Sequence, residues 1–306
     1  HGDPLKLAKY RIAFVADGIR PISGIPAMPV PIPPARIEVL NGAAAAAIYG
    51  SRANAGVIQI FTKRGRSGAP LVSFSTSVLV NELRKKLEVN QAPVKFGGPT
   101  DGPGALTQDI ISAIGTPPAL PTNTTPVTRY DYQDYIFRTG IGTDNAVSVS
   151  GGSEKTRYYL SGAYFFNQGI VQNTDFRRYN FRSNFDHTFN NVFSVTMGLN
   201  YNNSAANEKP NGNSFFSPLN SVTILGNFHN IFERDALGNA KAVGERGRVN
   251  PVSVIEDFKQ RQETNRIIAS LGAKLRPFTG FTFDYTLGID NYSQNGTTFM
   301  PPFPYN

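Results

Sequence analysis

The feature that most constrains this fold is a regular alternation of apolar residues with small or polar residues along extended segments. From 193 to 202 the odd positions are apolar and the even positions are small or polar. The pattern recurs, in places more weakly, over six other segments: 71–80, 145–151, 157–166, 178–189, 266–276 and 281–290. Alternation with period two is typical of a β-strand with one apolar and one polar face. The sequence therefore predicts seven β-strands, most of them about 9–11 residues long.

The length of these strands and their aromatic residues favour a membrane barrel over a soluble sheet. Strands of soluble proteins usually have about 5–6 residues, whereas a tilted strand that crosses a bilayer needs about 9–11. Aromatic residues stand near the strand ends, as in the girdles of outer-membrane barrels: Tyr179, Phe189, Phe193, Tyr201 and Phe281. We expect an all-β transmembrane antiparallel barrel, of which about seven strands are present, and a soluble β-rich binding module is the alternative.

The predicted connections give an independent indication. Longer connections alternate with short ones along the chain, and the longest lie at 81–144 and 203–265. Outer-membrane barrels have short turns at the periplasmic end and longer loops at the extracellular end. The two longest connections are therefore expected to be extracellular loops.

Composition excludes several classes of site. The chain has no Cys and only three His, which are far apart in the sequence, so no Cys-based zinc or iron–sulfur centre is expected. The net charge of +8 would suit nucleic acid, but the Lys and Arg residues are scattered and follow no recognised nucleic-acid-binding module. No catalytic grouping stands out either. We expect no enzymatic activity, no metal, no cofactor and no nucleic-acid partner.

Residues 1–66 follow a different pattern from residues 67–306. Short apolar strands are predicted at 12–15, 36–40 and 57–61, with an Ala-rich helical turn at 43–49. This composition predicts a small mixed α/β unit ahead of the barrel segment.

The α/β unit contains residues suited to a close, polar contact with a barrel interior: Gly42, Tyr49, Gly50, Ser51, Arg52, Asn54 and Gly56. The glycines permit tight turns where a β-carbon would clash. Ser51, Arg52 and Asn54 are able to form hydrogen bonds with polar residues on the inward face of the strands, for which the alternation indicates Arg178, Arg182 and Asp186. Such a polar interface would seat the unit and still allow it to move, although purely structural roles are the alternative for each residue.

A second candidate site lies in the first long connection. Asp131 and Asp134 are flanked there by Tyr130, Tyr132 and Tyr135. Aromatic and acidic side chains together suit contact with a sugar, so Tyr130, Asp131, Tyr132 and Asp134 are candidate ligand contacts. An ordinary surface loop is the alternative.

Several segments carry a resemblance to a known family: RIEVLNGAAAAAIYGSRANAGVIQIFTKRG (36–65), DYIFRTG (134–140), VSVSGGSEKTRYYL (147–160), GIVQNTDFRRY (169–179) and Asn250-Pro251. In this order they resemble the end of the plug domain and the first barrel strands of SusC/RagA-like TonB-dependent outer-membrane transporters. The resemblance implies a plug inside a barrel of roughly 22 strands. Seven strands alone would leave unpaired edges in hydrocarbon, so the chain is expected to be a fragment.

The resemblance also implies a function. A transporter of this family would sit in the bacterial outer membrane and import an oligosaccharide or a peptide. A SusD-like surface lipoprotein would cover its extracellular mouth, and a TonB–ExbB–ExbD complex would pull on the plug through a segment absent from this chain. A siderophore-type TonB-dependent receptor and a passive porin or structural barrel are the alternatives.

Overall fold

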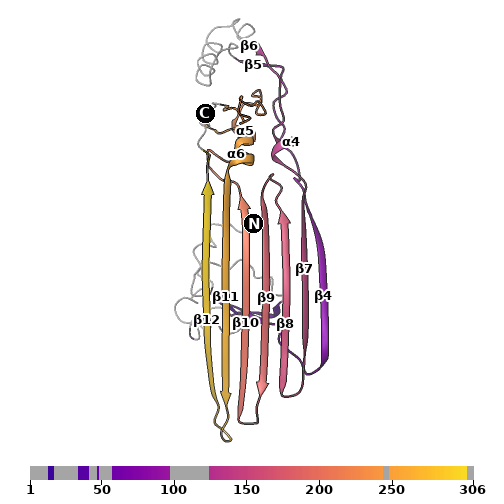
Figure 1. Ribbon diagram of the computed structural model, residues 1–306, viewed down its shortest axis with the longest axis vertical. Coiled ribbons are helices and arrows are strands. Elements are labelled where there is room, and N and C mark those ends of the chain that lie inside the picture. Colours follow the sequence, from indigo (N-terminus) through magenta and orange to yellow (C-terminus); the bar gives the residue numbers. More distant parts are fainter. Residues whose placement is uncertain are drawn as a thin grey trace.

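The structure is a computed structural model, and it describes residues 13–16, 34–40, 47, 57–96, 124–243 and 248–301. Its main feature is one antiparallel sheet of seven long strands in the order β12-β11-β10-β9-β8-β7-β4 (Figure 1). The strands are β4 (Gly68–Asn81), β7 (Gly140–Gly152), β8 (Thr156–Gln168), β9 (Asp175–Thr188), β10 (Phe193–Glu208), β11 (Lys259–Leu275) and β12 (Phe283–Phe299). The seven strands predicted from alternation are thus confirmed.

The strands have 13 to 17 residues and are longer than predicted. The reason is visible on β10, where the apolar residues of one face end at Tyr201 and Asn203 follows two positions later. The ladder continues beyond this point, since Asn203 pairs with Tyr179 on β9 and with Asn265 on β11. Alternation therefore measures the apolar band of each strand, while backbone hydrogen bonding extends the strand past the band.

This apolar band crosses the sheet obliquely. It covers 283–289 on β12 and 72–80 on β4, so its centre lies at Thr286 and at Thr76. When the paired residues are followed from strand to strand, Thr76 of β4 aligns with Ser293 of β12. The centre of the band on β12 is Thr286, which is seven residues away from Ser293. At about 3.3 Å per residue and about 4.8 Å between strands, this shift corresponds to an inclination of about 40°. Strands of barrels tilt by about 35–45° from the barrel axis. The apolar band is therefore parallel to the membrane plane when the strands have the tilt of a barrel wall.

The connections separate into two groups at opposite ends of the sheet (Figure 1). Short turns at 153–155, 189–192 and 276–282 lie at one end, and longer connections at 82–139, 169–174 and 209–258 lie at the other. The long connections are shorter than the predicted 81–144 and 203–265, because β7 starts earlier and β10 and β11 extend further than their apolar bands. None of the helices in the described ranges is long and apolar enough to cross a membrane.

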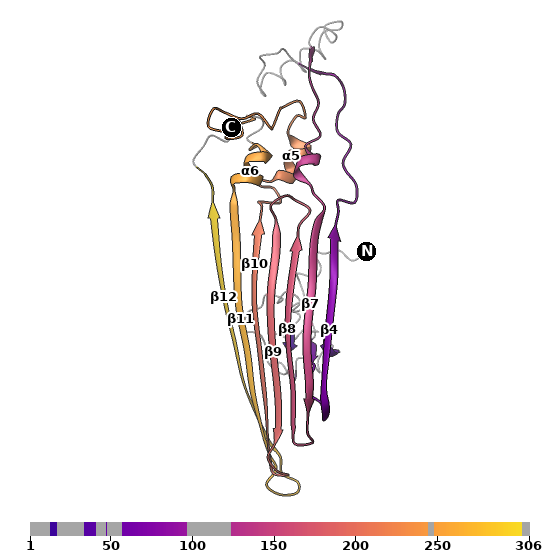
Figure 2. The ribbon, with the colours of Figure 1, turned by 45° about the vertical axis from the view of Figure 1, so that its right-hand side comes forward.

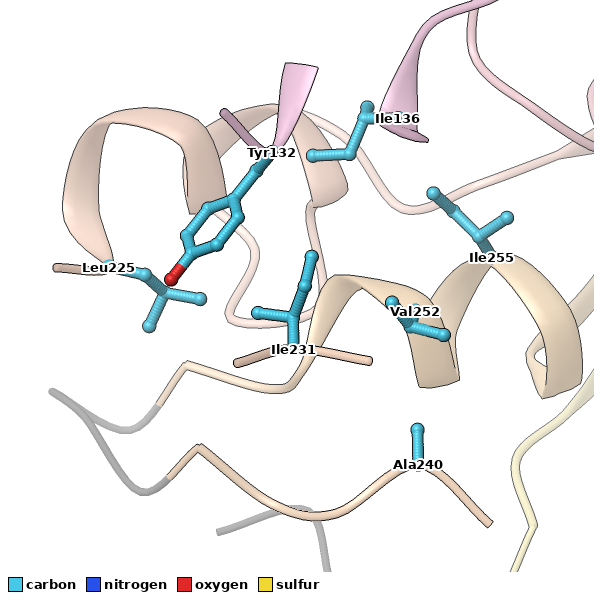
Figure 3. Packing of buried hydrophobic residues seen from close by; sticks show 7 residues of the cluster. All are labelled: Tyr132, Ile136, Leu225, Ile231, Ala240, Val252 and Ile255. Carbon is cyan, nitrogen blue, oxygen red and sulfur yellow. The ribbon is translucent and has the colours of Figure 1, made fainter. Parts of the chain in front are cut away.

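The longer connections pack together into one folded unit, which we call the loop cap (residues 127–139, 169–174, 209–243 and 248–258). It contains α4 (Gln133–Ile136), α5 (Pro218–Ile224) and α6 (Pro251–Asp257), and it stands above the ends of the strands (Figure 2). The same connections carry the short strands β5 (Val94–Phe96) and β6 (Thr124–Pro126). The buried residues of its core come from the connections 82–139 and 209–258 (Figure 3): Tyr132, Ile136, Leu225, Ile231, Ala240, Val252 and Ile255.

Local sequence explains where the two longer helices of the loop cap begin. Ser217 and Asn250 precede α5 and α6, and their side chains accept hydrogen bonds from the backbone N–H of Asn220 and Val252. A proline follows each cap residue at the first helical position, where its missing N–H costs nothing. The loop cap is thus a structured unit with its own core.

A second sheet of three strands precedes β4. It consists of β1 (Ala13–Ala16), β2 (Pro34–Leu40) and β3 (Val57–Thr62) in the order β1-β3-β2. β1 is parallel to β3 and β2 is antiparallel to it. The three short strands predicted in this part are confirmed, and Ala47, the one described residue of the Ala-rich turn, is helical. We call this unit the plug sheet.

Candidate functional site

The plug sheet is attached to the seven-stranded wall by the chain segment that leaves β3. We call residues 62–65 the linker, and the face of the wall on which the linker lies is the inward face. Arg182 Nη2 donates a hydrogen bond to Thr62 Oγ1, and Asn184 Nδ2 donates to the backbone oxygen of Lys63 at 2.7 Å. Next along both segments, Arg64 Nη1 lies 2.9 Å from Asp186 Oδ1 in an ion pair.

These contacts follow the geometry of a strand. Arg182, Asn184 and Asp186 are two residues apart on β9, so their side chains share one face. Three successive linker residues meet these three side chains in order. The linker therefore runs along β9 towards the end of the sheet that carries the short turns.

The exposed fractions of the β9 side chains indicate the environment of each face of the wall. Asn180, Arg182 and Asn184 on the inward face are 4–8% exposed, whereas Phe181 and Phe185 on the opposite face are 45% and 37% exposed. A soluble sheet buries its apolar face and exposes its polar face. The reverse arrangement, continued over the oblique apolar band, is that of an outer-membrane barrel wall with a lipid-facing exterior and a polar interior.

The structure places two of the three predicted inward residues against the linker. Arg182 and Asp186 contact it, while the Arg178 guanidinium lies 5.1 Å and 5.8 Å from the ring centroids of Phe165 and Phe176. Asn184 and the linker residues were not predicted, although Asn184 lies on the same alternating face as Arg182. The seven predicted plug-motif residues lie outside the described residues, and their role stays a prediction: Gly42, Tyr49, Gly50, Ser51, Arg52, Asn54 and Gly56.

The structure removes Tyr132 from the ligand patch predicted in the first long connection. Tyr132 is 2% exposed, and its hydroxyl lies 2.8 Å and 2.9 Å from the backbone oxygens of Gly226 and His229. Tyr132 is therefore a core residue in this structure, and the expectation that it faces a ligand is wrong. The physical reason is that Tyr132 and Ile136 are four residues apart and lie on one side of α4, which faces α5 and α6.

Two of the other three residues of that patch share a partner, since Lys86 pairs with both Asp131, at 3.7 Å, and Asp134. Asp131 accepts a hydrogen bond from the backbone N–H of Gln133 at 3.0 Å, and Asp134 is exposed and pairs with Lys86. Tyr130 is half-buried against the core of the loop cap. A ligand role for Tyr130, Asp131 and Asp134 stays a prediction.

A hollow of about 490 Å³ lies between the β8–β9 connection, the end of β10 and the start of α5. Its lining combines amide and charged groups with apolar side chains: Asn167, Asp175, Phe176, Glu208, Lys209 and Leu219. Asp175 accepts a hydrogen bond from Asn207 at 2.8 Å. Over the described part of the chain, no group of three or more potential ligands is placed to hold a metal ion.

Lys209 belongs to the framework of this hollow. Its ammonium donates hydrogen bonds to the backbone oxygens of Val254 at 3.0 Å and Phe258 at 2.6 Å, at the end of α6. Burial lowers the pKa of Lys209 to about 8. The end of β10 is thus tied to α6 by a group whose charge changes in mildly alkaline solution.

The chain is similar in sequence to TonB-dependent receptors, in agreement with the geometry of the wall and the plug sheet. The chain is 35% identical over 176 residues to "TonB-dependent receptor SusC" of Bacteroides thetaiotaomicron, which covers 55% of this chain and 16% of that protein. It is 34% identical over 172 residues to "TonB-dependent receptor P3" of Formosa agariphila, which covers 56% of this chain and 16% of that protein. The chain resembles SusC-like TonB-dependent receptors.

A longer alignment supports the same resemblance. "TonB-dependent receptor P39" of Formosa agariphila is 28% identical over 281 residues, which is 88% of this chain and 25% of that protein. The chain therefore spans between 16% and 25% of the length of these relatives. No family model matches the chain.

Solved structures show the same fold. The RagAB peptide importer in its open-open state superposes with a TM-score of 0.70 at 22% identity, over 96% of this chain and 36% of that chain. Its closed-closed state gives a TM-score of 0.67. The predicted fold class, a partial antiparallel barrel wall preceded by a plug segment, is confirmed. TonB-dependent receptors such as SusC are outer-membrane β-barrel proteins, and the chain is assigned to the same membrane.

Proposed function

We propose that this chain is part of a TonB-dependent importer that takes up an oligosaccharide or a peptide across the bacterial outer membrane. The observation that carries the proposal is the plug sheet, which is joined through the linker, by polar contacts, to the inward face of a lipid-facing wall. A passive porin has no need of a separate folded unit attached to its interior. In this proposal residues 1–66 belong to the plug and residues 67–306 to the wall.

The open edges of the wall support its place in a larger barrel. β4 and β12 each pair with one strand of the described sheet, so the outer edge of each presents unpaired backbone groups. Such edges cost several kcal/mol per unsatisfied group in hydrocarbon, so a membrane sheet must close on itself. Further strands would complete the barrel, in agreement with the greater length of the relatives.

The loop cap supports the proposed arrangement of partners. It stands at the end of the wall that carries the longer connections, which is the extracellular end in outer-membrane barrels. A SusD-like lipoprotein would rest on this side, and a TonB–ExbB–ExbD complex would act on the plug from the periplasm. The hollow beneath α5 is where we propose that the wall and the loop cap meet the cargo. SusC is named as a TonB-dependent receptor, which supports the mechanism, and RagAB as a peptide importer, which is in keeping with a peptide cargo.

Uptake by cells that carry the full-length protein tests this proposal. Fluorescent oligosaccharides and peptides of about ten units are offered to cells with and without TonB, and with and without the neighbouring lipoprotein. We expect accumulation of one cargo class that is lost when TonB is deleted and reduced when the lipoprotein is deleted. Accumulation that persists without TonB would favour the porin, and uptake confined to iron chelates would favour the siderophore-type receptor.

A further inference from the structure

We propose that the linker is a permanent anchor, which keeps β3 attached to the wall while β1 and β2 move during transport. The movement in this proposal rests on the proposed function, whereas the anchor itself rests on contacts of the described residues. In this proposal the plug sheet has a fixed strand, β3, and two movable strands, β1 and β2.

The first support is the density of contacts over the linker. Each of Thr62, Lys63 and Arg64 has a polar contact with a different side chain of β9. Thr62 is 4% exposed and its partner Arg182 is 4% exposed, whereas the ion pair is half-exposed, with Arg64 at 47% and Asp186 at 16%. Breaking the hydrogen bonds of Arg182 or Asn184 leaves a buried polar group without its partner, which is the costly case, and the half-exposed ion pair adds a smaller contribution.

The second support is the position of Gly65. A β-carbon at this residue would lie 2.3 Å from the backbone nitrogen of Tyr158 and 2.6 Å from its backbone oxygen. These atoms belong to β8, which is paired on both sides and cannot yield. The linker backbone therefore lies directly on the wall backbone, and this approach requires glycine.

The third support is the topology of the plug sheet. β3 is the central strand, and β1 and β2 each pair with β3 alone in the described sheet. The β1–β3 ladder joins four residue pairs, and the last residue of β3, Thr62, is also the first residue of the linker. A pull applied ahead of β1 loads this short ladder first, then the β2–β3 ladder, and the linker last. β3 therefore remains on the wall after its neighbours have left.

Hydrogen exchange of the full-length protein in detergent tests the anchor without any cargo. Arg64→Asp removes the ion pair with Asp186, and we expect amides of residues 57–66 to exchange about fivefold faster. The double exchange Arg64→Asp with Asp186→Arg should recover most of the protection. Arg66→Asp is the matched control, because Arg66 is exposed and makes no ion pair within the described ranges. Equal exchange in the Arg64 and Arg66 variants would overturn the anchor.

Photo-crosslinking in living cells tests whether the anchor persists during transport. A benzoylphenylalanine at Lys63, on the linker, should crosslink to residues 182–186 to within twofold in cells with and without TonB. The same group at Val39, which is 60% exposed on β2, should change its crosslinks at least threefold. Loss of the Lys63 crosslinks in the presence of TonB would overturn the proposal. Unchanged crosslinks at both positions would refute the movement, and the import mechanism with it, while the exchange result on the anchor stands.

Discussion

An arginine in place of Met197 tests the lipid-facing assignment of the wall at its most sensitive point. Met197 is 47% exposed and lies at the centre of the apolar band of β10, which runs from Phe193 to Tyr201. Each edge of the band is four residues away, or about 13 Å along the strand and about 10 Å in depth at a tilt of about 40°. The neighbours Phe185 and Leu271 offer no polar partner. We expect Met197→Arg to lower the free energy of unfolding by about 2–4 kcal/mol.

Two control variants separate lipid contact from general intolerance of arginine. Thr196 lies on the inward face opposite Asp186, so Thr196→Arg should cost less than about 1 kcal/mol. Asn203 lies on the outward face but beyond the apolar band, and Asn203→Arg should cost about 0–1 kcal/mol. The measurement is denaturant unfolding of the full-length protein in phospholipid vesicles, followed by tyrosine fluorescence. Equal losses for Met197→Arg and Thr196→Arg would refute a lipid-facing exterior and a polar interior.

Two further predictions concern the loop cap. Tyr132→Phe removes the hydroxyl beside the carbonyls of Gly226 and His229, and we expect a loss of about 1–3 kcal/mol in local stability; hydrogen exchange of α5 measures it, and unchanged protection would contradict the buried contact. Burial lowers the pKa of Lys209 from its ordinary value of 10.5 to about 8. Because the unfolded chain holds more protons between these values, stability of the cap should rise as the pH increases from about 8 to about 10.5. Lys209→Met should remove this rise in a pH series of cap unfolding, and identical curves for the two proteins would count against it.

The wall strands were predictable from sequence because lipid contact imposes a simple pattern. An outward face in hydrocarbon must be apolar at every second residue, and this requirement produces the alternation from Phe193 to Tyr201. Beyond Tyr201, both faces of β10 carry polar residues such as Asn202 and Asn203, so the pattern ends while the strand continues to Glu208. The oblique path of the band depends on the register between strands, which no single segment encodes.

The loop cap was not predictable, because its core is assembled from segments far apart in the chain. α4 has four residues and α5 and α6 have seven each, too few to show a helical period. From the sequence alone Tyr132 therefore has the features of an exposed loop residue. In the structure it packs in one core with Leu225 and Ile231. The same limit applies to the linker. The charges of Arg182 and Asp186 marked an inward face, but only the tertiary structure shows that residues 62–64 meet them.

The most direct measurement is a nitroxide scan along residues 194–201 of β10 in the full-length protein, reconstituted in phospholipid vesicles. Collision rates with oxygen, which concentrates in the bilayer, and with a water-soluble nickel complex distinguish lipid from water at each site. We predict that labels at 195, 197, 199 and 201 meet oxygen preferentially, with the strongest preference at Met197, and that labels at the even positions do not. Preferential contact of the odd positions with the nickel complex, or no alternation at all, would contradict a wall that faces lipid on one side and the plug sheet on the other.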